Sequence, residues 1–199
     1  MSFVKKITLT AAMLAISSTT AFAADQGHGK VNFHGFVIDA PCSIDPDSVD
    51  QTVEFGDISN KVLKGVNGEN LGKSSPQNFT IKLIDCEIST GAQVNITFSG
   101  GSATLPAGSK FKENSVLATT GSATGIGIIM TDQDSSNAVI LNQESSVKHL
   151  LQNGTNNLMF SAYVTGLGEP DNATDPANII PAINPGEFFA VTDFTLSYK

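Results

Sequence analysis

The chain has 199 residues, a mass of 20.8 kDa and 40% apolar residues, which is enough for one domain with a substantial core. Charged residues make up only 15% of it, so the chain is neither charge-rich disorder nor a coiled coil. It has 19 acidic residues, 11 lysines, no arginine and a formal net charge of −8. This balance argues against a basic phosphate-binding surface, and nucleic acid is not an expected partner.

The first 23 residues have the composition of a secretory signal peptide. Lys5 and Lys6 form a short basic start, an uncharged run rich in Leu, Ala and Thr follows, and a small-x-small cleavage site ends at Ala23. A membrane anchor is the alternative, but the apolar run is shorter than the roughly 20 residues that a spanning helix needs. We predict cleavage after Ala23 and export of residues 24–199.

The next segment alternates small or apolar residues with polar ones, as a β-strand does. Glycine weakens an ordinary strand and is tolerated where another backbone or wall comes very close. The pattern offers no obvious place for this strand in its own sheet. Pairing with another molecule, pairing within its own domain and disorder all stay open at this point. The small and apolar set is Gly27, Gly29, Val31, Phe33 and Gly35.

Cys42 and Cys86 are the only cysteines in the chain. In an oxidising compartment, two thiols without a third partner are typical of one disulfide. In the chain-entropy model, a loop of this length corresponds to about 4 kcal/mol of stabilisation. Zinc binding is the competing interpretation, but two isolated cysteines without a nearby histidine cannot complete a tetrahedral shell. We expect a disulfide between Cys42 and Cys86.

Short alternating or apolar runs dominate the rest of the chain, and helical periodicity is almost absent. This pattern predicts a single all-β sandwich or barrel after about residue 36. The predicted strands are Lys30–Ile44, Gln51–Asp57, Gln77–Cys86, Ala92–Ser99, Gly125–Thr131, Ala138–Asn142, Asn156–Leu167 and Phe188–Tyr198. Turn-forming residues separate them at 45–47, 67–68, 100–101, 132–137 and 153–154, and a surface loop is expected over 168–185.

The last predicted strand has two chemically different faces. Its even-numbered face is mostly apolar and is expected to lie on the core. No residues follow this strand to form a neighbour, so an uncovered edge would leave its hydrogen-bonding groups and apolar face to another segment. A strand without a place at one end of the chain and a vacant edge at the other suggest head-to-tail assembly. The even-numbered residues are Phe188, Ala190, Thr192, Phe194, Leu196 and Tyr198.

No set of residues points to catalysis or to a bound metal. His28 and His34 would lie roughly 20 Å apart on one strand face, too far to share an ion. Asp45, Asp47 and Asp50 lack the spacing of a calcium loop. A Gly-x-Ser-x-Gly nucleophile elbow is missing. We therefore expect no enzyme activity, no metal and no cofactor.

Several motifs along the chain together resemble those of one family. They are GKVNFHG at residues 29–35, DAPCSI at 39–44 and DQTVEFG at 50–56, followed by matching stretches at 79–86 and 150–163 and by Gly186 and the penultimate Tyr198. In this order they resemble the bacterial chaperone-usher pilins, especially the major rod subunits of P pili, mannose-resistant Proteus-like fimbriae and type 1 pili. Each motif alone is weak, but their order over nearly the whole exported chain is specific.

The resemblance implies an incomplete immunoglobulin-like sandwich, the pilin fold, that lacks its C-terminal seventh strand. In this family a periplasmic chaperone first lends a strand, which an outer-membrane usher exchanges for the N-terminal extension of the next subunit. Residues 1–23 would then be a signal peptide, 24–35 the donor-strand extension and 36–199 the pilin domain. The implied donor residues are Gly27, Gly29, Val31, Phe33 and Gly35, and the implied chaperone and groove residues are Gly186, Phe194, Leu196 and Tyr198.

The implied function is that of a structural subunit of a chaperone-usher fimbria, which polymerises head to tail and builds the shaft that supports bacterial adhesion. Expected partners are the periplasmic chaperone, the outer-membrane usher and identical or related pilins. The chain would be exported through the periplasm to the cell surface. The alternatives are a minor, tip or adaptor pilin, or a receptor-binding subunit, although tip adhesins usually carry a separate lectin domain and lack the donor extension. A secreted hydrolase would need a nucleophile, base and orienting group that the sequence does not offer.

Overall fold

The computed structural model describes residues 29–35, 37, 40–65, 70–106, 109–132, 137–145, 147–168 and 182–199. The predicted signal peptide, Gly27 and most of the predicted loop before the last strand lie outside these residues. The chain forms two units, residues 1–38 and 39–199. In the first unit, residues 29–35 belong to no helix or strand.

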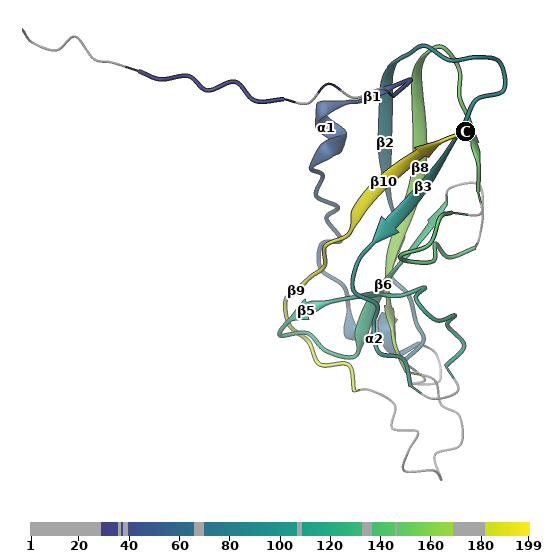
Figure 1. The fold of residues 1–199 in the computed structure, drawn as a ribbon. Coiled ribbons are helices and arrows are strands. Elements are labelled where there is room, and N and C mark those ends of the chain that lie inside the picture. The colour runs from purple at the N-terminus through teal and green to yellow at the C-terminus, as the bar shows by residue number, and fades with distance from the viewer. Residues whose placement is uncertain are drawn as a thin grey trace, which may run out of the picture. The chain divides into compact units, whose positions relative to one another are not determined.

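Two antiparallel sheets and a two-stranded ribbon form the second unit (Figure 1). The larger sheet has the order β1-β2-β8-β6-β4, and the smaller has the order β10-β3-β7. The strands of the larger sheet are β1 (Ser43–Ile44), β2 (Gln77–Cys86), β8 (Gly154–Gly166), β6 (Ile126–Asp132) and β4 (Leu117–Ala118). Those of the smaller are β10 (Asp193–Tyr198), β3 (Gln93–Ser99) and β7 (His149–Leu150), and β5 (Thr120–Gly121) pairs with β9 (Phe188–Phe189).

Side chains from both sheets meet in one core. β2 contributes Ile81 and Leu83, β8 contributes Phe160 and β3 contributes Phe98, and none of these side chains is more than 2% exposed. The rings of Phe98 and Phe160 pack edge to face with their centroids 5.1 Å apart. The predicted all-β sandwich is therefore confirmed.

Four predicted strands agree with the structure to within two residues. β2 has the predicted bounds, and β3, β6 and β8 begin or end one or two residues from theirs. Each of these strands pairs with a neighbour over most of its length. The alternation in the sequence therefore coincides with a hydrogen-bonded ladder in the structure.

Three predicted strands are wrong. Among the described residues of Lys30–Ile44, β1 alone is a strand. Gln51–Asp57 is not a strand, and in Ala138–Asn142 the one bridge in the described part joins Ala138 to Thr131. Alternation indicates which side chains are buried, whereas a strand also needs a neighbouring backbone at hydrogen-bonding distance. That neighbour is set by the fold and not by the segment itself.

The predicted strand Phe188–Tyr198 is divided because the chain changes partner. β9 pairs with β5, whereas β10 pairs with β3. Between them, the Thr192 hydroxyl donates a hydrogen bond to the Ser99 carbonyl at 3.1 Å. The residues of one predicted strand thus pair in two different sheets.

The described part of the second unit contains two short helices, α1 (Pro46–Val49) and α2 (Asn60–Lys64). The turn predicted at 45–47 instead begins α1, because the Asp45 side chain accepts a hydrogen bond from the Asp47 N–H and Pro46 occupies the first turn. Asp45 also contacts Lys82 Nζ at 2.8 Å, and this hydrogen bond holds the pKa of Asp45 below its usual value. Among the described helices, none has both the length and the apolar character to cross a bilayer.

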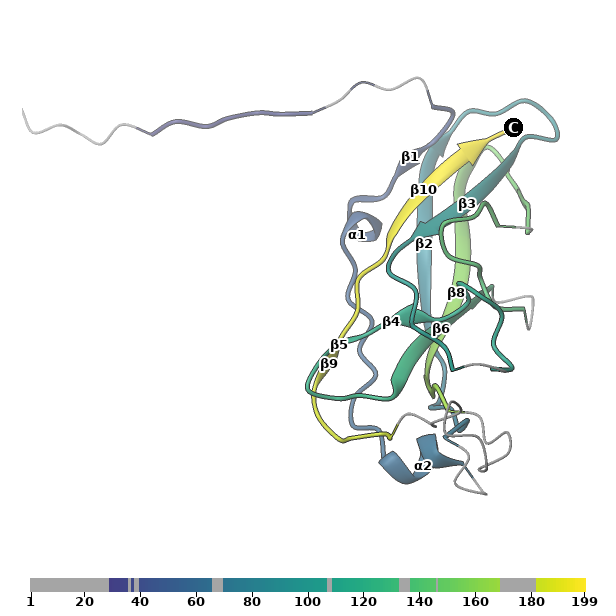
Figure 2. The same cartoon turned by 60° about the horizontal axis from the view of Figure 1, so that its bottom comes forward.

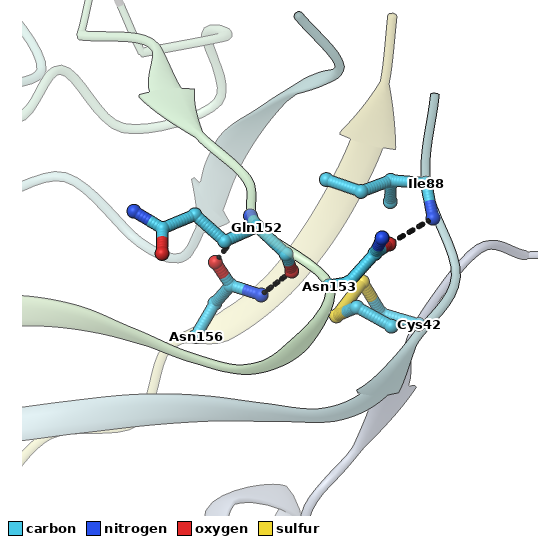
Figure 3. Close-up of a disulfide and its surroundings, with 6 residues drawn as sticks. Cys42, Ile88, Gln152, Asn153 and Asn156 are labelled. Atoms are coloured by element: carbon cyan, nitrogen blue, oxygen red, sulfur yellow. Dashed lines mark hydrogen bonds between the residues drawn. A yellow bond between two sulfur atoms is a disulfide. The ribbon is translucent and has the colours of Figure 1, made fainter. Parts of the chain in front are cut away.

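The expected disulfide joins Cys42 to Cys86, with the two Cα atoms 4.1 Å apart (Figure 3). It ties the start of β1 to the end of β2. Beside it, Asn153 Oδ1 accepts a hydrogen bond of 2.8 Å from the Ile88 N–H. Gly154 follows with a φ of +92°, a conformation that favours glycine and suits the predicted turn. The disulfide and the Asn153 side chain thus hold the same end of β2.

Replacing both cysteines with serine is expected to lower the free energy of unfolding by about 2–5 kcal/mol, because the cross-link no longer restricts the unfolded chain. Urea denaturation of the processed chain measures this loss. Wild-type protein treated with a reductant is the control and should lose the same amount. An unchanged unfolding midpoint in the double variant would contradict the structural role of the disulfide.

Candidate functional site

The edge of β10 is open along one side. β10 pairs with β3 from Asp193, opposite Ser99, to Tyr198, opposite Val94. It is the outer strand of the smaller sheet, and Figure 2 shows it lying along β3. In the described part of the chain, no strand pairs with its other side.

The hydrogen-bond pattern identifies the backbone groups at this edge. Lys199 and Gln93 exchange two backbone hydrogen bonds of 2.9 Å, so the odd-numbered residues of β10 are the ones bonded to β3. In an antiparallel pair the intervening residues turn their N–H and C=O groups the other way. These are Phe194, Leu196 and Tyr198, and their edge-facing groups make no backbone hydrogen bond within the described residues.

The same three residues carry apolar side chains that are only half-buried. Phe194, Leu196 and Tyr198 pack against the core, as do Phe188 and Ala190 earlier in the chain. The predicted apolar face of the last strand is therefore confirmed. Burial raises the pKa of the Tyr198 phenol above its ordinary value of 10.0. We call these three residues, with their free backbone groups, the β10 edge.

An extended segment, residues 51–58, runs between the two helices without joining a sheet. Val53, Phe55 and Ile58 are half-buried in it, and the last two pack against the core. The Phe55 and Phe188 rings lie 6.1 Å apart, which brings this segment beside the chain that leads into β10. It has the alternating burial of a strand but no backbone partner among the described residues. The alternation in the sequence indicates this segment, but it predicts a complete strand over Gln51–Asp57.

The C-terminal end of β10 is anchored by an ion pair that the sequence analysis missed. Lys199 Nζ lies 2.8 and 2.9 Å from the two carboxylate oxygens of Glu144. This hydrogen bond holds the pKa of Glu144 below its usual value. Glu144 itself bridges to Thr97 of β3, so Lys199 reaches across β3. Nothing in the local sequence could indicate a pair so far apart in the chain.

Gly186 lies apart from the β10 edge, just before β9. The Ser122 and Ala123 N–H groups both donate to the Glu187 carbonyl at 3.0 Å. A Cβ atom on Gly186 would be 2.5 Å from Ser122 Oγ and 2.6 Å from the Ala123 nitrogen. The structure thus gives Gly186 a packing role, because only a residue without a side chain allows this approach.

The donor residues predicted in the first unit are exposed where they are described. Val31 is 73% exposed and Phe33 is 93% exposed. Around Gly29 and Gly35, no atom would lie within 4 Å of an added Cβ. The two apolar side chains are thus left with most of their surface in water, which is unfavourable for residues of this type.

Comparison with known proteins places the chain among fimbrial proteins. The family model described as "Fimbrial protein" matches residues 31–199. The chain is 44% identical to the Fimbria A protein of Serratia marcescens over 98% of both chains. It is 37% identical to the Major MR/P fimbria protein of Proteus mirabilis, over 94% of this chain and 93% of that protein. A solved chaperone-usher pilus whose structure concerns rod uncoiling matches with a TM-score of 0.66 and 30% identity, over 87% of this chain and 97% of its own.

Gly186→Ala is expected to lower the free energy of unfolding by about 1–3 kcal/mol, because the added methyl group forces the backbone away from Ser122 and Ala123. Gly101→Ala is the matched control, since the nearest atom to its added Cβ would be Ala118 Cβ at 3.9 Å. Urea unfolding of the two variants measures the difference. Equal stability of both would contradict the packing role.

Proposed function

This chain belongs to the fimbrial protein family, and on that premise we propose that its β10 edge accepts the N-terminal extension of a neighbouring subunit. The chain is a structural subunit of the shaft of a chaperone-usher fimbria, with the immunoglobulin-like pilin fold of that class. It assembles with other pilins in a fimbrium at the cell surface. It is not an enzyme.

The observation that carries the proposal is the combination of free backbone groups and half-buried apolar side chains on the same three residues, Phe194, Leu196 and Tyr198. An added strand would pair the free backbone groups and bury the apolar side chains at the same time. Each main-chain hydrogen bond would contribute about 0.5–1.5 kcal/mol. Strand addition at an open edge is a general recognition mode, and chaperone–pilin complementation is one of its established examples.

The occupant that fits is the segment 24–35 of a second copy. Its alternate residues Val31 and Phe33 are the exposed apolar side chains described above. Burial of each against the neighbour's core would contribute roughly 1.5–3 kcal/mol. Gly27, Gly29 and Gly35 would lie at the same parity where the two backbones come closest. The sum of these contributions favours very slow dissociation.

The route to the surface follows from the same edge. We propose that the signal peptide, residues 1–23, is removed on export and that a periplasmic chaperone first covers the β10 edge. An outer-membrane usher would then allow the extension of the next subunit to replace it. Phe194, Leu196 and Tyr198 would contact the chaperone strand, and Gly186 would hold the chain that leads into them.

Phe33→Asp is expected to stop filament growth, because the variant would bury an unpaired carboxylate on strand addition. Asn32→Asp is the matched control, since it adds the same charge at the neighbouring position of opposite parity. Electron microscopy of cells that express each variant, with antibody against the subunit, measures shaft formation. Normal shafts from Phe33→Asp, or equal loss in both variants, would refute the donor assignment.

The ionisation of Tyr198 is expected to report whether the β10 edge is occupied. The chain has two tyrosines and no tryptophan, so in Tyr163→Phe the tyrosinate absorbance comes from Tyr198 alone. Burial raises the pKa of Tyr198, so the protonated phenol contributes to the stability of the folded chain. This contribution is complete below the unfolded pKa of about 10 and is lost as the pH rises through the higher folded pKa. A neighbour's strand should bury the ring further, so the ionisation midpoint should be higher in filaments than in the free processed chain.

Tyr198→Phe, which leaves only Tyr163, is the control for this titration. Burial also raises the pKa of Tyr163, but this residue packs against Val116, Ile129 and Leu167, a hydrophobic cluster separate from the core that the β10 edge contacts. Its midpoint should be the same in filaments and in the free chain. The same midpoint for Tyr198 in both states would contradict occupation of the edge.

A further inference from the structure

The larger sheet has an edge of its own, on β2. β8 covers one side of β2 along most of its length, whereas β1 covers the other side only at Leu83 and Ile84. The Asp45 N–H donates to the Lys82 carbonyl at 2.9 Å, so the backbone groups of Lys82 point toward this side. By alternation, those of Thr80 and Asn78 do the same. The subunit therefore has an edge on β2, besides that on β10, to which a strand could add.

Side chains, and not a strand, bind the β2 edge. Ser48 Oγ accepts a hydrogen bond from the Lys82 N–H at 3.0 Å. Gln51 Nε2 donates to the Thr80 carbonyl at 3.0 Å and to the Ser48 carbonyl at 3.2 Å. With the bond from Asp45, three consecutive edge-facing groups of Thr80 and Lys82 are thus satisfied. Only the Thr80 N–H and the groups of Asn78 remain, which is too short a stretch for a strand ladder.

Packed atoms do not fill the space beside the β2 edge. A cavity of about 480 Å³ lies against β2, and its lining includes Gln51, Thr52, Asn78 and Thr80. Residues 51–54 line the cavity on the side facing β2, and no strand of the described residues fills it. The Gln51 side chain, itself exposed, is the group that reaches across to the strand.

We propose that Ser48 and Gln51 are specificity-determining residues that block the β2 edge and confine strand addition to the β10 edge. Exposed edges invite unwanted pairing, and proteins prevent it with local features that satisfy or hide the edge groups. The excluded occupant is the extension of a second copy, residues 24–35, which is present on every subunit at high local concentration. This inference rests on the proposed function, because it takes strand addition at β10 as the wanted reaction.

The test uses assembled filaments and a fluorescent synthetic peptide with the sequence of residues 24–35. In wild-type filaments the neighbour's extension fills the β10 edge of every subunit except a terminal one, so peptide should bind in a small ratio to subunit. In Gln51→Ala filaments an edge should be open on every subunit. Bound peptide per subunit should then rise about tenfold or more, since binding extends along the whole filament.

Two variants serve as matched controls. Thr52→Ala changes the next residue, which makes no side-chain hydrogen bond among those described, and should bind like the wild type. Gln51→Lys keeps a long side chain that can donate to the Thr80 carbonyl and should restore the low ratio. If Gln51→Ala yields no filaments, Ser48→Ala, which frees the Lys82 N–H at the same edge, is assayed in its place.

The ratio of bound peptide to subunit decides for or against the blocking role. A low ratio in wild-type and a high ratio in Gln51→Ala filaments support the blocking role. Low ratios in both overturn it and leave the proposed function intact. A high ratio already in wild-type filaments would also overturn the blocking role, because every subunit would then hold an open edge, whereas the proposed function is tested separately by Phe33→Asp.

Discussion

The structure depends on one constraint, which is that backbone N–H and C=O groups buried near a core must find hydrogen-bond partners. On β10, the groups of Phe194, Leu196 and Tyr198 have none in the described part of the chain, although their side chains already contact the core. The apolar side chains stay partly exposed to water until another segment covers them, and the backbone groups stay unpaired until another strand lies beside them. One added strand would meet both requirements, as we propose for the extension of a neighbouring subunit.

The rest of the sandwich keeps this unfinished edge in a fixed shape. The edge-to-face pair of Phe98 and Phe160 holds the two sheets together in the core. Lys199, paired with Glu144, fixes the end of β10 across β3. The disulfide between Cys42 and Cys86 secures the opposite sheet where β1 meets β2. A site formed by a strand edge needs such support, since the incoming backbone must meet its partners in register.

The β2 edge and the β10 edge of the subunit differ in whether their backbone groups have hydrogen-bond partners among the described residues. At β2, the side chains of Ser48 and Gln51 satisfy Lys82 and Thr80, so the edge is closed without a neighbouring strand. At β10, the corresponding groups are left for another segment. Assembly into a linear filament requires this difference, because a subunit with two equally open edges could accept two neighbours and branch.

The sequence alone determined the sandwich class, the disulfide, the four long strands and the apolar parity of Phe194, Leu196 and Tyr198, because alternation and residue chemistry are local properties. It did not determine that residues 51–58 lack a backbone partner among the described residues, that Phe188–Tyr198 pairs in two sheets, or that Lys199 meets Glu144. Those features depend on which backbones come within hydrogen-bonding distance after the chain has folded. Only the tertiary structure decides that, since a strand edge is defined by the neighbour it has or lacks.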